Sequence, residues 1–168
     1  AGEENGGAGL LRFPMTTPAD GDELRFISHI EERYDASPDA FAGMEISNRH
    51  TDAKLDETML QFLALSAANP EAGQKLVKNF ELYPDEIFAA GTDYREKIFE
   101  KWDRETAKRP FTGIGANDAH QNQIFKGTTF DPYEVSFRNL TTHILARDLT
   151  ERDVRDALRD GHAYVSHD

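Results

Sequence analysis

The stretch from Phe111 to Asn122 constrains this chain more than any other. Its first part, Phe111 to Ala116, is apolar and rich in small residues, a pattern typical of a buried strand. The run then ends abruptly in polar residues, with Asp118 and His120 two positions apart. Because residues at this spacing leave the same face of an extended backbone, we expect a carboxylate and an imidazole side by side at a strand end.

Asp118 and His120 are side chains of the kind that bind a divalent metal ion carrying a reactive water. The alternative is that Asp118 caps a turn and His120 is an ordinary surface histidine, since Asp-x-His is a common triplet. The chain has no cysteine, which excludes disulfides, thiolate zinc sites and thiol nucleophiles. A metal site would therefore use His, Asp, Glu and water, a ligand set that suits zinc, manganese, iron or magnesium without choosing among them.

The composition narrows the classes of partner. The 168 residues suffice for one domain, and 38% hydrophobic content with 11 Phe can supply its core. The net charge of −12 disfavours nucleic acid or an anionic membrane surface as the main partner, but not a small phosphorylated substrate held through bound cations. No run of transmembrane length and no signal peptide is recognisable, so localisation is open, with the cytoplasm as first expectation.

Apolar runs and turn signals predict strands that alternate with helices. The predicted strands cover residues 24–30, 41–47, 111–116, 135–137, 140–145 and 163–166. The predicted helices are a buried one at 56–68, others beginning at Pro70 and Pro84, one at 94–108, and one that begins after Thr150 and stops at Gly161. This alternation predicts an α/β architecture with largely parallel strands, and Glu and Lys residues of the central helices are expected to face solvent.

Polar side chains recur where the predicted strands end. His29 closes the first strand, His50 follows the second, and Asp118 with His120 follow the third. Because the carboxyl ends of parallel strands converge on one face, we expect these groups to meet there, although His29 alone is as consistent with a structural role. His50 and Asp52 could face substrate, or Thr51 and Asp52 could cap the next helix. Glu45, inside its strand, is expected to be structural.

Four segments occur together in a characteristic order: His29 at a strand end, Gly43-Met44-Glu45-Ile46-Ser47-Asn48, Asn117-Asp118-Ala119-His120, and the unit from Leu149 to Val165. In this order they resemble the later half of the PHP (polymerase and histidinol phosphatase) superfamily. The resemblance covers roughly residues 24–166, and Asn-Asp-Ala-His is its most specific part. It implies a partial or distorted (β/α)7 TIM-like barrel, spanning residues 1–168 as a single domain truncated at both ends, with residues 51–110 as a helical insertion or crossover.

The resemblance also implies a function. Family members bind two or three divalent metals, which we expect to be zinc, manganese or iron, and most hydrolyse phosphate esters. His29, Asp118 and His120 match family metal ligands, and Glu4 is a further candidate for a metal-bridging glutamate. Arg49 and His50 are candidates for contact with the substrate.

The family's opening His-x-His strand is absent from this sequence, so about half of a metal site is visible. Two alternatives to a phosphoesterase therefore stay open. One is a non-catalytic metal-binding or regulatory domain, and the other is a metal hydrolase of the amidohydrolase type.

Overall fold

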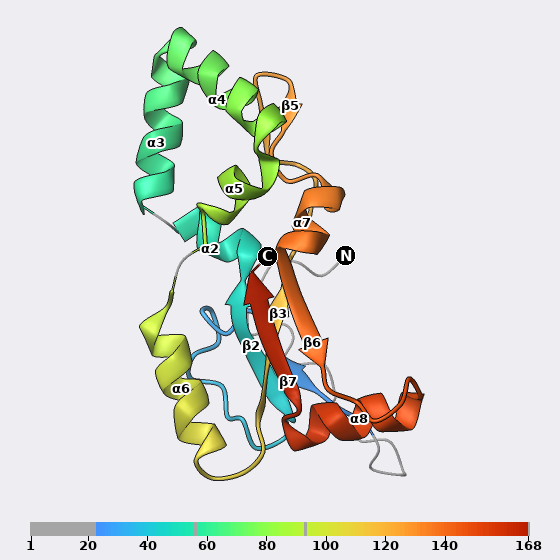
Figure 1. The fold of residues 1–168 in the computed structure, drawn as a ribbon. Coiled ribbons are helices and arrows are strands. Elements are labelled where there is room, and N and C mark those ends of the chain that lie inside the picture. The colour runs from blue at the N-terminus through green and yellow to red at the C-terminus, as the bar shows by residue number, and fades with distance from the viewer. Residues whose placement is uncertain (1–22, 56, 93, 168) are drawn as a thin grey trace, which may run out of the picture. The chain divides into compact units, whose positions relative to one another are not determined.

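The computed structural model describes residues 23–167 apart from residues 56 and 93 (Figure 1). Backbone contacts divide these residues into two compact units. The first combines residues 23–46, 95–114 and 144–164, and the second combines residues 47–94, 115–143 and 165–167. The helices predicted within residues 51–110 are present, and they are divided between the two units at residues 94 and 95.

The first unit contains β1 (Phe26–Ile27) and the first residues of the other two strands of a three-stranded sheet. β1 pairs in parallel with β2 (Gly43–Asn48), and β3 (Thr112–Ala116) is the other neighbour of β2. The strands predicted at 41–47 and 111–116 are thus confirmed. The strand predicted at 24–30 is much shorter than expected, and the backbone of His29 has a φ of 48°, which is incompatible with an extended strand.

A compact apolar core holds this sheet against α6 (Glu96–Thr106). Its buried members come from β1, the turn after it, β2, α6 and the residue before β3, and are Ile27, Ile30, Met44, Ile98 and Phe111. Trp102 packs against this core, and its indole N–H donates a 2.8 Å hydrogen bond to the carbonyl of Phe111. The apolar side predicted for this helix from Ile98 and Trp102 is therefore the face that stabilises the first unit.

Lys101 departs from the expectation that the lysines of the central helices face solvent. It is only 5% exposed, and its ammonium group donates hydrogen bonds to the carbonyls of Tyr34 and, at 2.8 Å, Ala36. Burial lowers the pKa of Lys101 below its ordinary value of 10.5, and the nearby carboxylates of Glu105 and Asp35 partly oppose this shift. The side chain therefore ties the turn after β1 to α6.

We expect Lys101→Met to lower the free energy of unfolding by about 1–3 kcal/mol, because two carbonyls lose their donor. The loss should grow as the pH rises toward 10.5, because in this range the unfolded chain binds more protons at Lys101 than the folded chain does. Urea unfolding at several pH values measures both effects, with the exposed Lys97→Met on the same helix as control. Parallel pH profiles of the parent and the Lys101 variant would contradict this account.

The second unit is mainly helical. Its elements are α2 (Arg49–Leu55), α3 (Glu57–Ala68), α4 (Pro70–Leu82), α5 (Pro84–Ala89), the antiparallel hairpin of β4 (Ile124–Phe125) and β5 (Thr128–Thr129), and α7 (Tyr133–Asn139). α3 and α4 form a helical hairpin, visible in green in Figure 1, and the side-chain oxygen of Asn69 caps α4 by accepting from the backbone N–H groups of Glu71 and Ala72. Proline at the first position of α4 and α5 agrees with the prediction.

Two local predictions in this unit are wrong. Residues 135–137, predicted as a strand, belong to α7, where the buried Val135, Ser136 and Asn139 recur at helical spacing. The polar residues after β2 form the helix α2, which is capped by Asn48 and not by Thr51 or Asp52. The Asn48 side-chain oxygen accepts a 3.0 Å hydrogen bond from the backbone N–H of Thr51, three residues on.

The helix α3 is confirmed but is not buried as predicted. Leu60 and Phe62 are each 47% exposed and Leu65 is 69% exposed, although the helix packs on α4. An apolar helix with this much exposed side-chain surface has one face covered by its neighbour and other faces without such cover.

The remaining elements are β6 (Leu140–Ile144), α8 (Glu151–Asp160) and β7 (Ala163–His167), and β6 and β7 form a two-stranded sheet. The predicted caps of α8 are both confirmed: the Thr150 side chain accepts from the backbone N–H of Asp153, and Gly161 has a left-handed φ of 78°. The part of the chain that the structure describes is thus of mixed α/β class, with small sheets and no closed barrel. No helix in that part is long and apolar enough to cross a membrane.

Candidate metal centre

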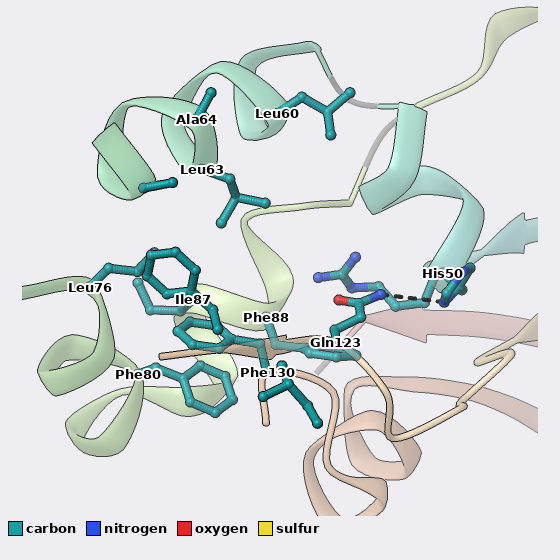
Figure 2. Close-up of a pocket in the computed structure, with 14 residues that line it drawn as sticks. His50, Leu60, Leu63, Ala64, Leu76, Phe80, Ile87, Phe88, Gln123 and Phe130 are labelled. Carbon is teal, nitrogen blue, oxygen red and sulfur yellow. Dashed lines mark hydrogen bonds between the residues drawn. The ribbon is translucent and has the colours of Figure 1, made fainter. Parts of the chain in front are cut away.

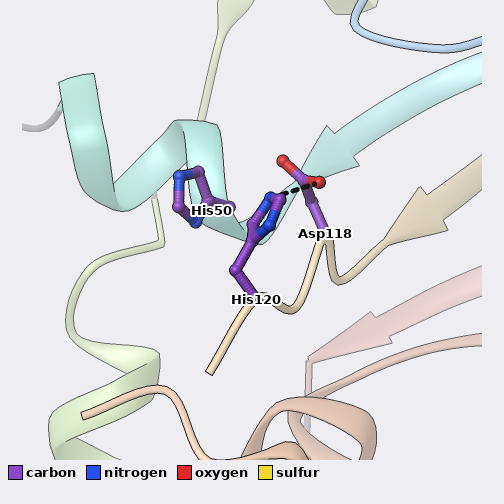
Figure 3. Close-up of side chains that lie close together, drawn as sticks. All are labelled: His50, Asp118 and His120. Carbon is purple, nitrogen blue, oxygen red and sulfur yellow. Dashed lines mark hydrogen bonds and ion pairs between the residues drawn. The ribbon is translucent and has the colours of Figure 1, made fainter. Parts of the chain in front are cut away.

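Three ligand-type side chains of the second unit come together at one point. The ligand atoms of His50, Asp118 and His120 all lie within 4.8 Å of one another (Figure 3). His120 Nε2 is 3.1 Å from Asp118 Oδ1, and the rings of His50 and His120 meet edge to face with their centroids 4.8 Å apart. The predicted proximity of Asp118 and His120 is therefore confirmed, and His50 joins them as the third member.

The neighbouring strands β2 and β3 lead to this cluster. β2 ends at Asn48, just before the first turn of α2 that carries His50, and β3 ends at Ala116, two residues before Asp118. Figure 3 shows both strands running toward the three side chains. The expectation that polar side chains gather where these two strands end is thus confirmed for His50, Asp118 and His120.

The reason predicted for the proximity of Asp118 and His120 is wrong in one respect. Residues 117–120 are not extended, and Asp118 has a φ of 48° in the left-handed region. Aspartate tolerates this conformation better than most residues do, and such conformations are enriched at functional sites. The turn at Asp118, and not strand alternation, brings its carboxylate against His120.

The arrangement fits a divalent ion. Zinc binds nitrogen and oxygen ligands at about 2.0–2.2 Å, which in a tetrahedral site separates the ligand atoms by about 3.4 Å. The 3.1 Å between Asp118 Oδ1 and His120 Nε2 is close to this spacing. His120 has a half-exposed side chain, which leaves it room to rotate toward a common ion. Two imidazoles, one carboxylate and an open position form the ligand pattern of catalytic rather than structural zinc sites.

Gln123 and Asp131 hold His50 in place. The buried Asp131 carboxylate accepts hydrogen bonds from the backbone N–H groups of Asn122 (3.1 Å) and Gln123 (2.8 Å). This anchors the loop so that the Gln123 side-chain amide lies 3.3 Å from His50 Nδ1. In the structure the amide nitrogen faces the ring and donates to Nδ1. With the amide turned over, its oxygen would accept from Nδ1–H, and Nε2 would carry the lone pair that a metal ion needs.

A small cavity behind the cluster is lined by polar groups that include Arg49, Asn117 and Asp118. The Asn117 amide donates to the carbonyl of Leu140 at 3.0 Å, whereas its Oδ1 is buried without a hydrogen-bond partner among the described residues. A buried acceptor in this state is costly unless a donor or cation reaches it. Arg49 is buried, with its guanidinium 4.0 Å above the Phe88 ring and an N–H donated to the carbonyl of Gly91 at 3.1 Å.

The other predicted ligands have different outcomes. His29 belongs to the first unit, where its ring Nδ1 lies 3.0 Å from Glu31 Oε1 and its backbone N–H donates to Glu45 Oε2 at 2.7 Å. Glu45 is buried and has the structural role expected of it. Its carboxylate fixes the turn at His29, so the ligand role of His29 stays a prediction. Glu4 lies outside the described residues.

One residue of the site carried no recognisable signal in the sequence, because Gln123 lies in a loop without a motif. Asn117 belongs to the Asn-Asp-Ala-His motif, but the sequence does not indicate what its side chain does. The sequence predicts His50 as a substrate contact and not as a metal ligand, although Asn48 followed by Arg49, His50 and Thr51 is a recognisable helix start. That start places His50 in the first turn of α2.

Comparison with models of protein families, with curated protein sequences and with solved structures finds no match for this chain.

Proposed function

We propose that this chain is part of a metal-dependent hydrolase that acts on a phosphate ester, with His50, Asp118 and His120 as metal ligands. The convergence of these three side chains within 4.8 Å is the observation that carries the proposal. The Asn117–His120 motif supports membership of the PHP superfamily, and with it a partial or distorted (β/α)7 TIM-like barrel. His29, which belongs to the first unit, and Glu4, which lies outside the described residues, stay ligands implied by the family resemblance alone.

A divalent ion bound here would supply hydroxide near neutral pH by lowering the pKa of a coordinated water. The reaction adds water across the P–O bond and releases an alcohol and a phosphate. Arg49 and the candidate ligand His50 line one cavity of about 600 Å³, so the Arg49 guanidinium would stabilise the negative charge that develops on the oxygens of a phosphoryl group bound there. Asn117 lines a small cavity with Asp118, and its buried amide oxygen would accept a hydrogen bond from a proton donor bound there.

The expected activity is hydrolysis of a chromogenic phosphodiester in the presence of zinc, manganese or iron. It should stop when a chelator removes the metal and return when the metal is restored. Because Asp118 supplies the only carboxylate of the cluster, Asp118→Asn should lower kcat by at least about 100-fold. Hydrolysis of a lactone without hydrolysis of the phosphodiester would favour the amidohydrolase alternative.

The non-catalytic alternative makes a different prediction in the same assay. A regulatory domain of this type would bind metal through His50, Asp118 and His120 and hydrolyse neither substrate. Arg49→Gln distinguishes the two cases further, because in an enzyme this change should lower turnover while the metal content stays the same. In a metal-binding domain without catalysis, the variant would have no activity to lose.

A further inference from the structure

The second unit contains a cavity of about 600 Å³ whose walls are mainly apolar (Figure 2). This volume lies within the range of about 300–1,000 Å³ that is usual for small-molecule sites. Leucine and alanine side chains of α3 form one wall, and aromatic side chains of α4, α5 and the β4–β5 hairpin form the other. The main contributors are Leu63, Ala64, Leu76, Phe80, Phe88 and Phe130.

The polar groups of this cavity gather at one end. Arg49, His50 and Gln123 lie there, and Figure 2 shows the hydrogen bond between Gln123 and His50. Among the described residues that line the cavity, Arg49 is the single charged one and none carries a carboxylate. His50 also belongs to the metal cluster, so the polar end of the cavity and the candidate metal centre share a side chain. The cavity is therefore suited to a ligand with an anionic head and an apolar body.

The apolar walls of this cavity are partly open to solvent. Leu60 is 47% exposed and Ile124 is 67% exposed, although both line it. Exposed apolar surface costs roughly 25 cal/mol per Å², so a ligand that covers these side chains would gain affinity from its apolar part. Within α3, such a ligand would cover Leu60 and Leu63, whereas the exposed Phe62 and Leu65 do not line the cavity.

We propose that the cavity binds the alkyl or aryl group of an amphiphilic phosphate ester, with the phosphoryl group at Arg49, His50 and Gln123. The identity of the head group rests on the proposed function, whereas the preference for an apolar body follows from the cavity itself. The substrate class is thus narrowed from phosphate esters in general to those whose leaving alcohol is apolar.

The test uses alkylphosphonates, which are not hydrolysed, with chains from methyl to decyl and below their micelle-forming concentrations. Calorimetric titration of the full chain should show the affinity rising about three- to fourfold for each added methylene until the cavity is filled. Ala64→Trp, which fills the cavity from α3, should remove this dependence and weaken decylphosphonate binding by at least about 50-fold. Ala68→Trp on the same helix, outside the cavity lining, should bind as the parent does.

The outcomes separate this inference from the proposed function. Chain-length dependence that persists in an Asp118→Ala, His120→Ala variant without metal supports the cavity even if the chain hydrolyses nothing. Metal-dependent hydrolysis combined with equal affinity for methyl- and decylphosphonate overturns the cavity inference alone. Equal weakening by both tryptophan variants also overturns it. If Ala64→Trp fails to fold, as judged by circular dichroism, Leu63→Gln replaces it with the exposed Leu65→Gln as its control.

Discussion

Replacing Asp118 and His120 together by alanine is expected to remove bound transition metal from the purified protein. The two changes delete two of the three ligand atoms that lie within 4.8 Å of one another. Loss of a residue that merely supports a ligand typically costs 10- to 100-fold in affinity, so loss of two ligands should cost more than about 100-fold. Elemental analysis of the parent should find at least about one equivalent of metal, and the double variant should contain almost none.

The chain offers a matched control for this experiment. Asp160 and His162 have the same two-residue spacing, are both exposed, and lie at the end of α8 outside the cluster. An Asp160→Ala, His162→Ala variant should therefore retain the metal of the parent. Equal loss in the two double variants would show that the metal is held non-specifically. A parent that binds no metal while folded would contradict the proposed centre.

Gly43→Ala is expected to cause a large loss of stability in the first unit. A Cβ atom at Gly43 would lie 2.0 Å from the backbone oxygen of Thr112 and 2.8 Å from the ring of Phe26. Because a backbone oxygen in a sheet cannot move aside as a flexible side chain can, β2 and β3 would have to separate. Overpacking of this kind costs about 1–3 kcal/mol and occasionally more, and we expect about 3 kcal/mol here.

The measurement is urea unfolding followed by the fluorescence of Trp102, the single tryptophan, which packs against the core beside these strands. Gly161→Ala is the control, because its Cβ would meet nothing nearer than the Thr112 hydroxyl at 3.9 Å. Its cost should be about 1 kcal/mol and arise from the left-handed φ of 78° alone. If the two variants were equally stable, the close contact between β2 and β3 at Gly43 would be disproved.

Local features of the fold could be predicted wherever the signal acts within a few residues. The caps of α8 at Thr150 and Gly161, and the proline starts of α4 and α5, follow from hydrogen bonds and backbone preferences inside one or two turns. The prediction of a strand at residues 135–137 is wrong because a three-residue apolar pattern does not distinguish a strand from a helix. Burial of Val135, Ser136 and Asn139 on one helical face decided that case.

The candidate site was predictable to a similar extent. Asp118 and His120 could be paired from their spacing, because only one residue separates them in the chain. The role of Gln123 could not be predicted, since it depends on the buried Asp131 holding a loop backbone. The exposure of apolar side chains on α3 could not be predicted either, because a hydrophobic sequence indicates that a helix needs an apolar neighbour but does not identify that neighbour.

The amino-acid sequence by itself determined which reactive groups this chain can offer: it has no thiol, and it has an Asp-x-His pair after an apolar strand. Its capping residues also determined where several helices begin or end. Only the tertiary structure decided which histidine joins that pair. His50 reaches Asp118 because β2 and β3 are neighbours in one sheet, although five helices separate them along the chain. Capping and periodicity act over a few residues, whereas strand pairing across such a distance depends on the burial of side chains from the whole unit.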